Sequence, residues 1–278
     1  MSKVRKPIKS MVIPQMSSED GGMRWDRSIS LPGMDYLDPV LVFEHFSRTD
    51  DFDRYFHKTQ KRYAGMQMIS YLLAGKYHYR SAKKEIGTVT SGSLLWVKSA
   101  AGVDLEEVFE TDQNLLEGFQ IWINLPASQK ETVPEFIQVN QPQIPTIRQN
   151  DGSMIRVLIG TFHQTQGVIV LQQPTINLYE LLIPPYASFS FESSFDTSMV
   201  YLYQGRGYFG NYEEQEDVMA TRHKLLIYGE GDYILIRTEE TPMRLLYLSG
   251  EAIREPVARY GSFVMNQPEE IKKHFPKS

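Results

Sequence analysis

A short aromatic segment, Ser70-Tyr-Leu-Leu-Ala-Gly-Lys-Tyr-His78, returns in the second half of the chain as Val200-Tyr-Leu-Tyr-Gln-Gly-Arg-Gly-Tyr208. Each copy is typical of a strand that turns at a glycine and continues. Each is followed by a glycine that opens another strand pair, in Thr90-Ser-Gly-Ser-Leu-Leu-Trp96 and in Gly229-Glu-Gly-Asp-Tyr-Ile-Leu235. This weak internal repeat predicts one β-barrel unit that is used twice.

The remainder of the chain has the same character. Short runs rich in Val, Ile, Tyr, Phe and Leu recur between Gly, Pro, Ser and Asn, which indicates an all-β protein. The clearest expected strands are 66–73, 93–97, 119–124, 155–161, 176–182, 199–204, 224–228, 233–238 and 244–249. A short C-terminal helix is expected over 267–275, because Pro268 suits a first helical turn and the charges that follow match the helix dipole.

The length of 278 residues favours two domains of roughly 140 residues each. The stretch 135–151 contains Pro142 and Pro145 and few packable runs, so it is the expected join. The predicted domains are an N-terminal barrel over 1–140 and a C-terminal barrel over 141–278 that carries the helix.

Composition excludes several classes of function. The chain has no cysteine, which excludes disulfides, thiolate metal sites and a cysteine nucleophile. Its net charge is -5, and no long basic run follows the first few residues, so direct nucleic-acid binding is disfavoured. No apolar stretch is long enough for a membrane span or a signal peptide, and the expected location is the cytoplasm.

Four longer stretches resemble the pirin family of double cupins. They are Leu31-Pro-Gly33, Leu37-Asp-Pro-Val-Leu-Val-Phe-Glu-His-Phe46, Gly118-Phe-Gln-Ile-Trp-Ile-Asn-Leu-Pro126 and Gly250-Glu-Ala-Ile-Arg-Glu-Pro-Val-Ala-Arg-Tyr-Gly-Ser-Phe-Val-Met-Asn266. The resemblance implies a bicupin of two stacked jelly-roll barrels. It also implies one non-haem iron in the N-terminal barrel, held by three histidines and a glutamate. These ligands come from a His-Pro-His-Arg-Gly motif and a His-Ser-Glu motif.

This chain departs from both motifs. With Tyr71 as the anchor, the first motif falls on Lys61-Arg-Tyr-Ala-Gly65, so Lys61 and Tyr63 stand where the resemblance implies histidines. The second motif falls on Leu105-Glu-Glu107, so Glu107 is the one ligand that matches. The resemblance therefore implies a degenerate metal site, with iron or another divalent transition metal as the family's expectation.

Residues two apart on a strand share a face, so Lys61, Tyr63, Leu105 and Glu107 are expected to line one pocket in the barrel. A charged lysine has only hydrogen-bond donors and cannot bind a cation. One hypothesis is that Lys61 takes the place of the metal's charge and pairs with Glu107. The alternative is that His57 and His78 complete a substitute two-histidine, one-carboxylate site with Glu107.

Three functions follow from these observations. The missing ligands favour a protein that binds a small molecule or acts in regulation without redox chemistry. The resemblance also implies, as an alternative, a metal-dependent dioxygenase of the quercetin 2,3-dioxygenase type, which needs an open metal site. A module that docks on a protein partner is the third. The segment Arg254-Glu-Pro-Val-Ala-Arg259 is expected to close the second barrel, with a binding patch as its alternative role.

Overall fold

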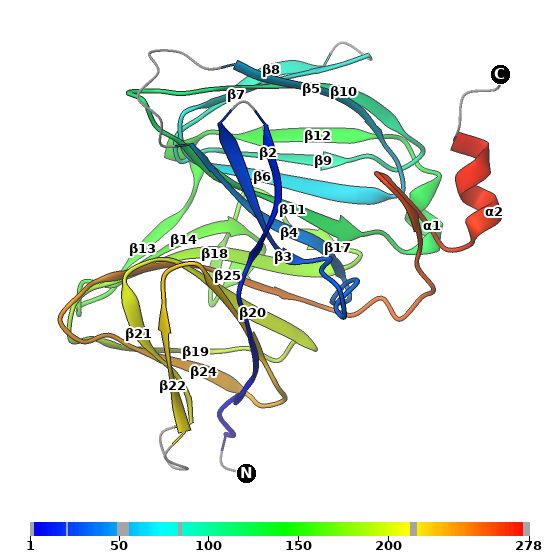
Figure 1. The fold of residues 1–278 in the computed structure, drawn as a ribbon. Coiled ribbons are helices and arrows are strands. Elements are labelled where there is room, and N and C mark those ends of the chain that lie inside the picture. Colours follow the sequence, from blue (N-terminus) through cyan, green and yellow to red (C-terminus); the bar gives the residue numbers. More distant parts are fainter. Residues whose placement is uncertain (1–2, 21, 49–55, 83–84, 212–215, 275–278) are drawn as a thin grey trace. The chain divides into compact units, whose positions relative to one another are not determined.

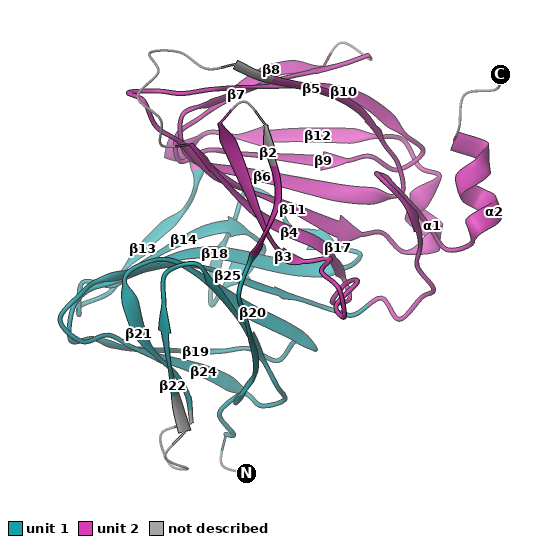
Figure 2. Ribbon diagram, viewed as in Figure 1, with its two compact units in different colours: residues 1–14, 144–252 teal, residues 15–143, 253–278 magenta. Residues whose placement is uncertain are grey.

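The computed structural model describes residues 3–20, 22–48, 56–82, 85–211 and 216–274 (Figure 1). The chain forms two compact units (Figure 2). Residues 15–143 and 253–278 make up one unit, here called the N-terminal barrel, and residues 1–14 and 144–252 make up the other, the C-terminal barrel.

Two antiparallel sheets form the walls of the N-terminal barrel, and a separate two-stranded sheet lies in its C-terminal segment. In its described residues, the larger sheet has the order β12-β9-β6-β11-β4-β3-β2 and the smaller has the order β5-β10-β7-β8. The elements are β2 (Gln15–Asp20), β3 (Met23–Ile29), β4 (Val40–Arg48), β5 (Phe56–Tyr63), β6 (Met66–Ala74), β7 (Lys76–Ser81), β8 (Ile86–Thr90), β9 (Leu94–Lys98), β10 (Val103–Glu110), β11 (Leu116–Asn124), α1 (Ala127–Lys130), β12 (Glu135–Val139), η1 (Gln141–Gln143), β26 (Ala258–Tyr260), β27 (Phe263–Met265), α2 (Pro268–Ile271) and η2 (Lys272–His274).

The C-terminal barrel repeats this architecture. Its larger sheet has the order β1-β23-β20-β25-β18-β14-β13, with β17 added beside β18, and its smaller sheet has the order β19-β24-β21-β22. The elements are β1 (Ile8–Val12), β13 (Thr146–Arg148), β14 (Met154–Ile159), β15 (Thr161–Phe162), β16 (Thr165–Gln166), β17 (Leu171–Gln172), β18 (Thr175–Ile183), β19 (Ser188–Glu192), β20 (Thr197–Gln204), β21 (Arg206–Asn211), β22 (Glu216–Thr221), β23 (Lys224–Tyr228), β24 (Tyr233–Arg237) and β25 (Met243–Gly250).

The predicted all-β bicupin is confirmed, and each of the nine expected strands coincides with a strand of the structure. Alternation explains why these runs form strands: along β10, Leu105, Glu107 and Phe109 are buried while the residues between them are partly exposed. In the interior, Phe109 contacts both Trp25 and Phe46, with ring centroids 5.8 and 5.2 Å away. Such edge-on aromatic contacts stabilise the barrel beyond the burial of area alone.

The ends of the chain differ from the predicted division into 1–140 and 141–278. Strand β1 pairs with β23 of the C-terminal barrel, while residues 253–278 fold with the N-terminal barrel. The join at 143/144 lies within the expected stretch 135–151. Arg254 to Arg259 therefore belong to the first barrel and do not close the second.

The C-terminal helix is present as α2 and η2, whereas Phe275 lies outside the described residues. Pro268 occupies the first turn as predicted, and the Glu270 carboxylate accepts a hydrogen bond from the backbone N–H of Gln267 at 2.8 Å. This contact satisfies one of the amide groups that every helix start leaves without an intrahelical partner. No helix in the described ranges is long and apolar enough to cross a membrane.

Candidate functional site

Strands β5 and β10 bring most of the predicted pocket residues to one region of the N-terminal barrel. The Cα register pairs Lys61 with Leu105, Tyr63 with Val103 and Thr59 with Glu107. Leu105 is fully buried, and Tyr63 and Glu107 are both 2% exposed. The structure therefore places Tyr63, Leu105 and Glu107 in the barrel interior.

Glu107 is the centre of a buried hydrogen-bond network. Its Oε2 accepts from the Tyr63 hydroxyl at 2.7 Å and from the Thr59 hydroxyl at 3.4 Å. Its Oε1 accepts from the Tyr77 hydroxyl at 2.8 Å and from the Gln120 amide at 3.2 Å. A carboxylate has about four lone-pair sites, so these four protein donors occupy the hydrogen-bonding capacity of Glu107.

The two tyrosines act as neutral donors. Burial raises the pKa of Tyr63 and the pKa of Tyr77 well above the usual value, and the negative charge of Glu107 raises both further. Loss of the phenolic proton would place a second negative charge beside Glu107 in a site shielded from water. Both hydroxyls therefore keep their protons across the physiological range and hold the carboxylate in place.

These residues do not fit the family's iron. At the four ligand positions the chain has an exposed ammonium, a protonated phenol, an isobutyl group and a carboxylate. Metal ligands must present a lone pair, and here only Glu107 is of the usual kind, with its oxygens already bonded by protein donors. In the part of the chain that the structure describes, no three His, Asp or Glu side chains form a cluster that could hold a metal ion.

Lys61 does not make the predicted ion pair. Its residue is exposed, whereas Glu107 is buried, and no salt bridge joins the two within the described residues. Strand β5 is at the edge of its sheet, and a lysine stem is long enough to carry the ammonium from such a position into water.

The substitute histidine site is not assembled by the described side chains. His78 pairs with Val108, on the face of β7 and β10 opposite to Glu107. Its imidazole lies 2.9 Å from the Thr88 hydroxyl and 3.1 Å from Glu110. The backbone of His57 lies in β5, but its side chain is outside the described residues.

Sequence reasoning missed the partners of Glu107 that lie on other strands. Tyr77 comes from β7, whose interior face it shares with Tyr79, and Gln120 comes from β11 in the opposite sheet. The available signal was alternation, because Gly118, Gln120 and Trp122 share one face of β11. Only the fold shows that this face meets Glu107.

A cavity of about 390 Å³ also lies in the N-terminal barrel. It is lined by Ser30, Asp35, Tyr36, Leu41, Val257, Arg259 and Gly261. The Arg259 guanidinium donates to the Ser30 hydroxyl at 2.9 Å and lies over the Trp122 ring, 5.3 Å from its centroid. Burial and the nearby charge of Arg27 lower the pKa of Arg259. An acceptor group of a ligand would therefore stabilise this guanidinium.

Hydrogen bonds connect this cavity to Glu107. The Trp122 indole N–H donates to the side-chain Oε1 of Gln120 at 3.4 Å, and the side-chain Nε2 of Gln120 donates in turn to Glu107. The Tyr63 ring also packs edge-on against Trp122, with centroids 5.7 Å apart. A molecule that contacts Arg259 would thus lie next to the network around Glu107.

Comparison with known proteins agrees with this architecture. Human pirin is 29% identical over 96% of this chain and 90% of its own length, and a pirin-like protein of Arabidopsis thaliana is 29% identical over 97% and 87%. The structure of a quercetin 2,3-dioxygenase from Acinetobacter baumannii superposes with a TM-score of 0.82 at 21% identity, covering 97% of this chain and 95% of that one. The pirin model matches residues 23–123, and the pirin C-terminal cupin domain matches residues 178–277. The chain therefore belongs to the pirin family.

Proposed function

We propose that this pirin-family bicupin binds a small molecule in its N-terminal barrel without a metal, as a binding or regulatory protein. The observation that carries the proposal is the state of Glu107, whose carboxylate accepts hydrogen bonds from Tyr63, Tyr77, Gln120 and Thr59. The residue that matches the family's metal ligand is thus held by the protein itself. The cavity beside Arg259 is the proposed place of the ligand.

Arg259 supplies the chemistry of recognition at this cavity. At the cavity it contacts the Ser30 hydroxyl, the Gly261 carbonyl oxygen and the Trp122 ring. The negative charge of Asp35, which also lines the cavity, favours the charged guanidinium. This guanidinium can donate a further hydrogen bond to a carbonyl, phenolate or carboxylate oxygen of a ligand. The volume of about 390 Å³ falls within the range of small-molecule sites.

Quercetin is the first ligand to test, because a structurally similar protein is described as a quercetin 2,3-dioxygenase. We expect metal-free protein to bind quercetin, with quenching of Trp122 fluorescence, and to leave it chemically unchanged. The variant Arg259→Gln should bind about 10- to 100-fold more weakly, because it loses a charge-assisted hydrogen bond. Arg80→Gln, at an exposed position on β7, is the matched control and should bind as the wild type does.

The same samples distinguish binding from turnover. Fe(II), Ni(II) or Mn(II) is added with dioxygen, and the consumption of quercetin is followed by absorbance. Consumption that needs the metal and is lost in Glu107→Gln would contradict the proposal and establish the dioxygenase. Equal affinity of the wild type and Arg259→Gln for quercetin would show that the ligand does not bind at the Arg259 cavity.

A further inference from the structure

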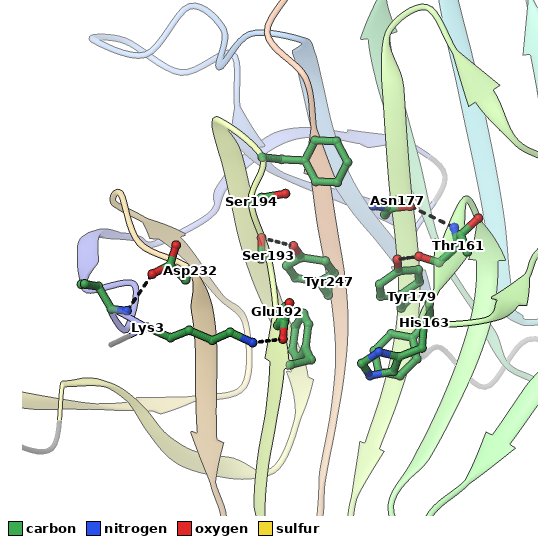
Figure 3. A pocket seen from close by; sticks show the side chains of 14 residues that line it. Lys3, Thr161, His163, Asn177, Tyr179, Glu192, Ser193, Ser194, Asp232 and Tyr247 are labelled. Carbon is green, nitrogen blue, oxygen red and sulfur yellow. Dashed lines mark hydrogen bonds and ion pairs between the residues drawn. The ribbon is translucent and has the colours of Figure 1, made fainter. Parts of the chain in front are cut away.

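A larger cavity, of about 640 Å³, lies in the C-terminal barrel (Figure 3). It is lined by Lys3, Val4, Thr161, Phe162, His163, Asn177, Tyr179, Phe191, Glu192, Ser193, Ser194, Phe195, Asp232 and Tyr247. None of these positions corresponds to the metal motifs, which fall in the other barrel. The cavity is therefore separate from the candidate metal positions.

One side of the cavity is a continuous aromatic wall. Tyr179 and Tyr247 stack with their ring centroids 5.5 Å apart, and Phe191 meets Tyr247 edge-on at 4.7 Å. Phe162 adds an edge contact to Tyr179 at 5.3 Å. A wall of this kind favours a flat ligand that can stack on or against the rings.

Two hydroxyl groups of this wall can act only as acceptors toward a ligand. Tyr179 donates its hydroxyl proton to the Thr161 carbonyl oxygen, and Tyr247 donates to the Ser193 hydroxyl at 2.6 Å. Burial raises the pKa of Tyr179 and that of Tyr247, so each phenol stays protonated. Its single O–H is already used as a donor to a protein acceptor. What remains on each oxygen is a lone pair, and its complement is a hydroxyl donor on the ligand.

Asn177 offers the opposite polarity. Its Oδ1 accepts from the backbone N–H of Thr161 at 3.0 Å, which fixes the orientation of the amide. The amide nitrogen is therefore directed away from Thr161 (Figure 3). A carbonyl or ether oxygen on the ligand would accept from this fixed donor.

The polar groups form a layer that the strand register builds into the barrel. Ser249 of β25 pairs with Asn177 of β18 on one side and with Ser198 of β20 on the other. The Ser198 and Ser193 hydroxyls lie 2.8 Å apart, and Ser193 accepts from Tyr247. The Ser249 hydroxyl is fully buried, and together with the Ser193 and Ser198 hydroxyls it offsets part of the rise that burial causes in the pKa of Tyr247. Asn177 and Ser193 of this layer line the cavity, so the layer reaches the space in which a ligand would bind.

The charged groups at the rim have partners within the protein. Lys3 forms an ion pair with Glu192, and Asp232 accepts from the backbone N–H of Val4 at 2.7 Å. The His163 ring packs edge-on against Phe162, with centroids 4.5 Å apart. Lys3 neutralises Glu192, while Asp232 keeps its negative charge, so the cavity favours a neutral ligand over an anionic one.

From these contacts we propose that the C-terminal barrel holds a second binding site, for a small neutral phenol. The ring of the ligand packs on the aromatic wall, its hydroxyls donate to Tyr179 and Tyr247, and an oxygen acceptor faces Asn177. The site is independent of Glu107 and of the cavity at Arg259.

Resorcinol is a suitable probe, because it places two hydroxyl donors on one small ring. We expect ligand-detected NMR titration to show binding to the wild type, and binding that is about 3- to 10-fold weaker to Tyr247→Phe, which loses one acceptor but keeps its ring. Tyr179→Phe provides a second variant with the same expectation. Tyr228→Phe is the matched control: Tyr228 is buried in the same barrel and does not line the cavity, so its loss should leave the affinity unchanged.

Three results would overturn the proposal. The first is no binding of resorcinol, and the second is unchanged affinity in folded Tyr247→Phe and Tyr179→Phe. The third is binding of glucose but not resorcinol, which would replace the phenol with a carbohydrate. Arg259→Gln separates the two barrels: it should not affect the titration with resorcinol, and an effect of this variant alone would locate the probe in the N-terminal barrel.

Discussion

Replacement of Glu107 by alanine is expected to lower the free energy of unfolding of the N-terminal barrel by about 3 kcal/mol. The substitution leaves the hydroxyls of Tyr63 and Tyr77 and the amide of Gln120 without their acceptor in a buried site. Each buried donor without a partner costs about 1–3 kcal/mol, and removal of the buried charge offsets part of the sum. Glu107→Gln retains the shape and should lose roughly half as much.

The measurement is urea unfolding followed by tryptophan fluorescence. All three tryptophans, Trp25, Trp96 and Trp122, belong to the N-terminal barrel, so the signal reports on this unit. Glu106→Gln is the matched control, since Glu106 lies on the outer face of the same strand and forms an ion pair with Lys58 at the surface. Its loss should change the unfolding free energy by less than about 1 kcal/mol. Equal effects of the two substitutions would contradict the structural role of Glu107.

Gly65→Ala is the second substitution with a large expected effect, about 3 kcal/mol or more. Gly65 has a φ of +76°, and a Cβ atom at this position would lie 1.7 Å from the Val264 carbonyl oxygen. The left-handed backbone alone costs an alanine about 1–2 kcal/mol. The overlap with Val264 must then be relieved by a shift of the backbone of β27, which carries the C-terminal segment.

A buried lysine extends the effect of this substitution. Lys130 donates to the carbonyl oxygens of both Gly65 and Val264, at 2.8 and 3.1 Å, and burial lowers the pKa of Lys130 to about 8. Movement of Val264 would weaken this junction, so we expect faster proteolysis after residue 252 as well as a lower unfolding free energy. Gly33→Ala is the control, because Gly33 has a similar φ of +83° but no atom within 4 Å of the added Cβ. If both substitutions cost the same, the overlap with Val264 is not the cause.

Local patterns predicted nine of the strands, but β5 and β10, which carry the candidate site, were not among them. A strand alternates its faces with a period of two, so spacing places residue 61 with 63, and residue 105 with 107, on a common face. Their assignment to one pocket came from the resemblance to the pirin motifs. Alternation also puts His78 on the face of its strand opposite to Tyr77, but it does not say which of the two faces is interior. The structure pairs Tyr77 with the buried Phe109, so the Tyr77 face is interior and His78 lies outside.

Contacts between distant segments could not be predicted. Strand β1 reaches β23 across more than 200 residues of sequence, and Arg259 returns from the C-terminal segment to lie over Trp122. Nothing in the local pattern around Arg259 indicates this ring as its partner. The exposure of Lys61 has a similar origin, because it depends on β5 being an edge strand.

The central claim is that the Glu107 site does not bind iron. Its most direct test is the iron content of the protein after anaerobic incubation with Fe(II) and removal of free metal. Wild type and Glu107→Gln are compared with a triple variant, Lys61→His, Tyr63→His and Leu105→His, which restores the histidines of the family motif around Glu107. We predict iron close to background in the first two proteins and a gain in the triple variant. Near-stoichiometric iron in the wild type, lost in Glu107→Gln, would contradict the account and make Glu107 a metal ligand.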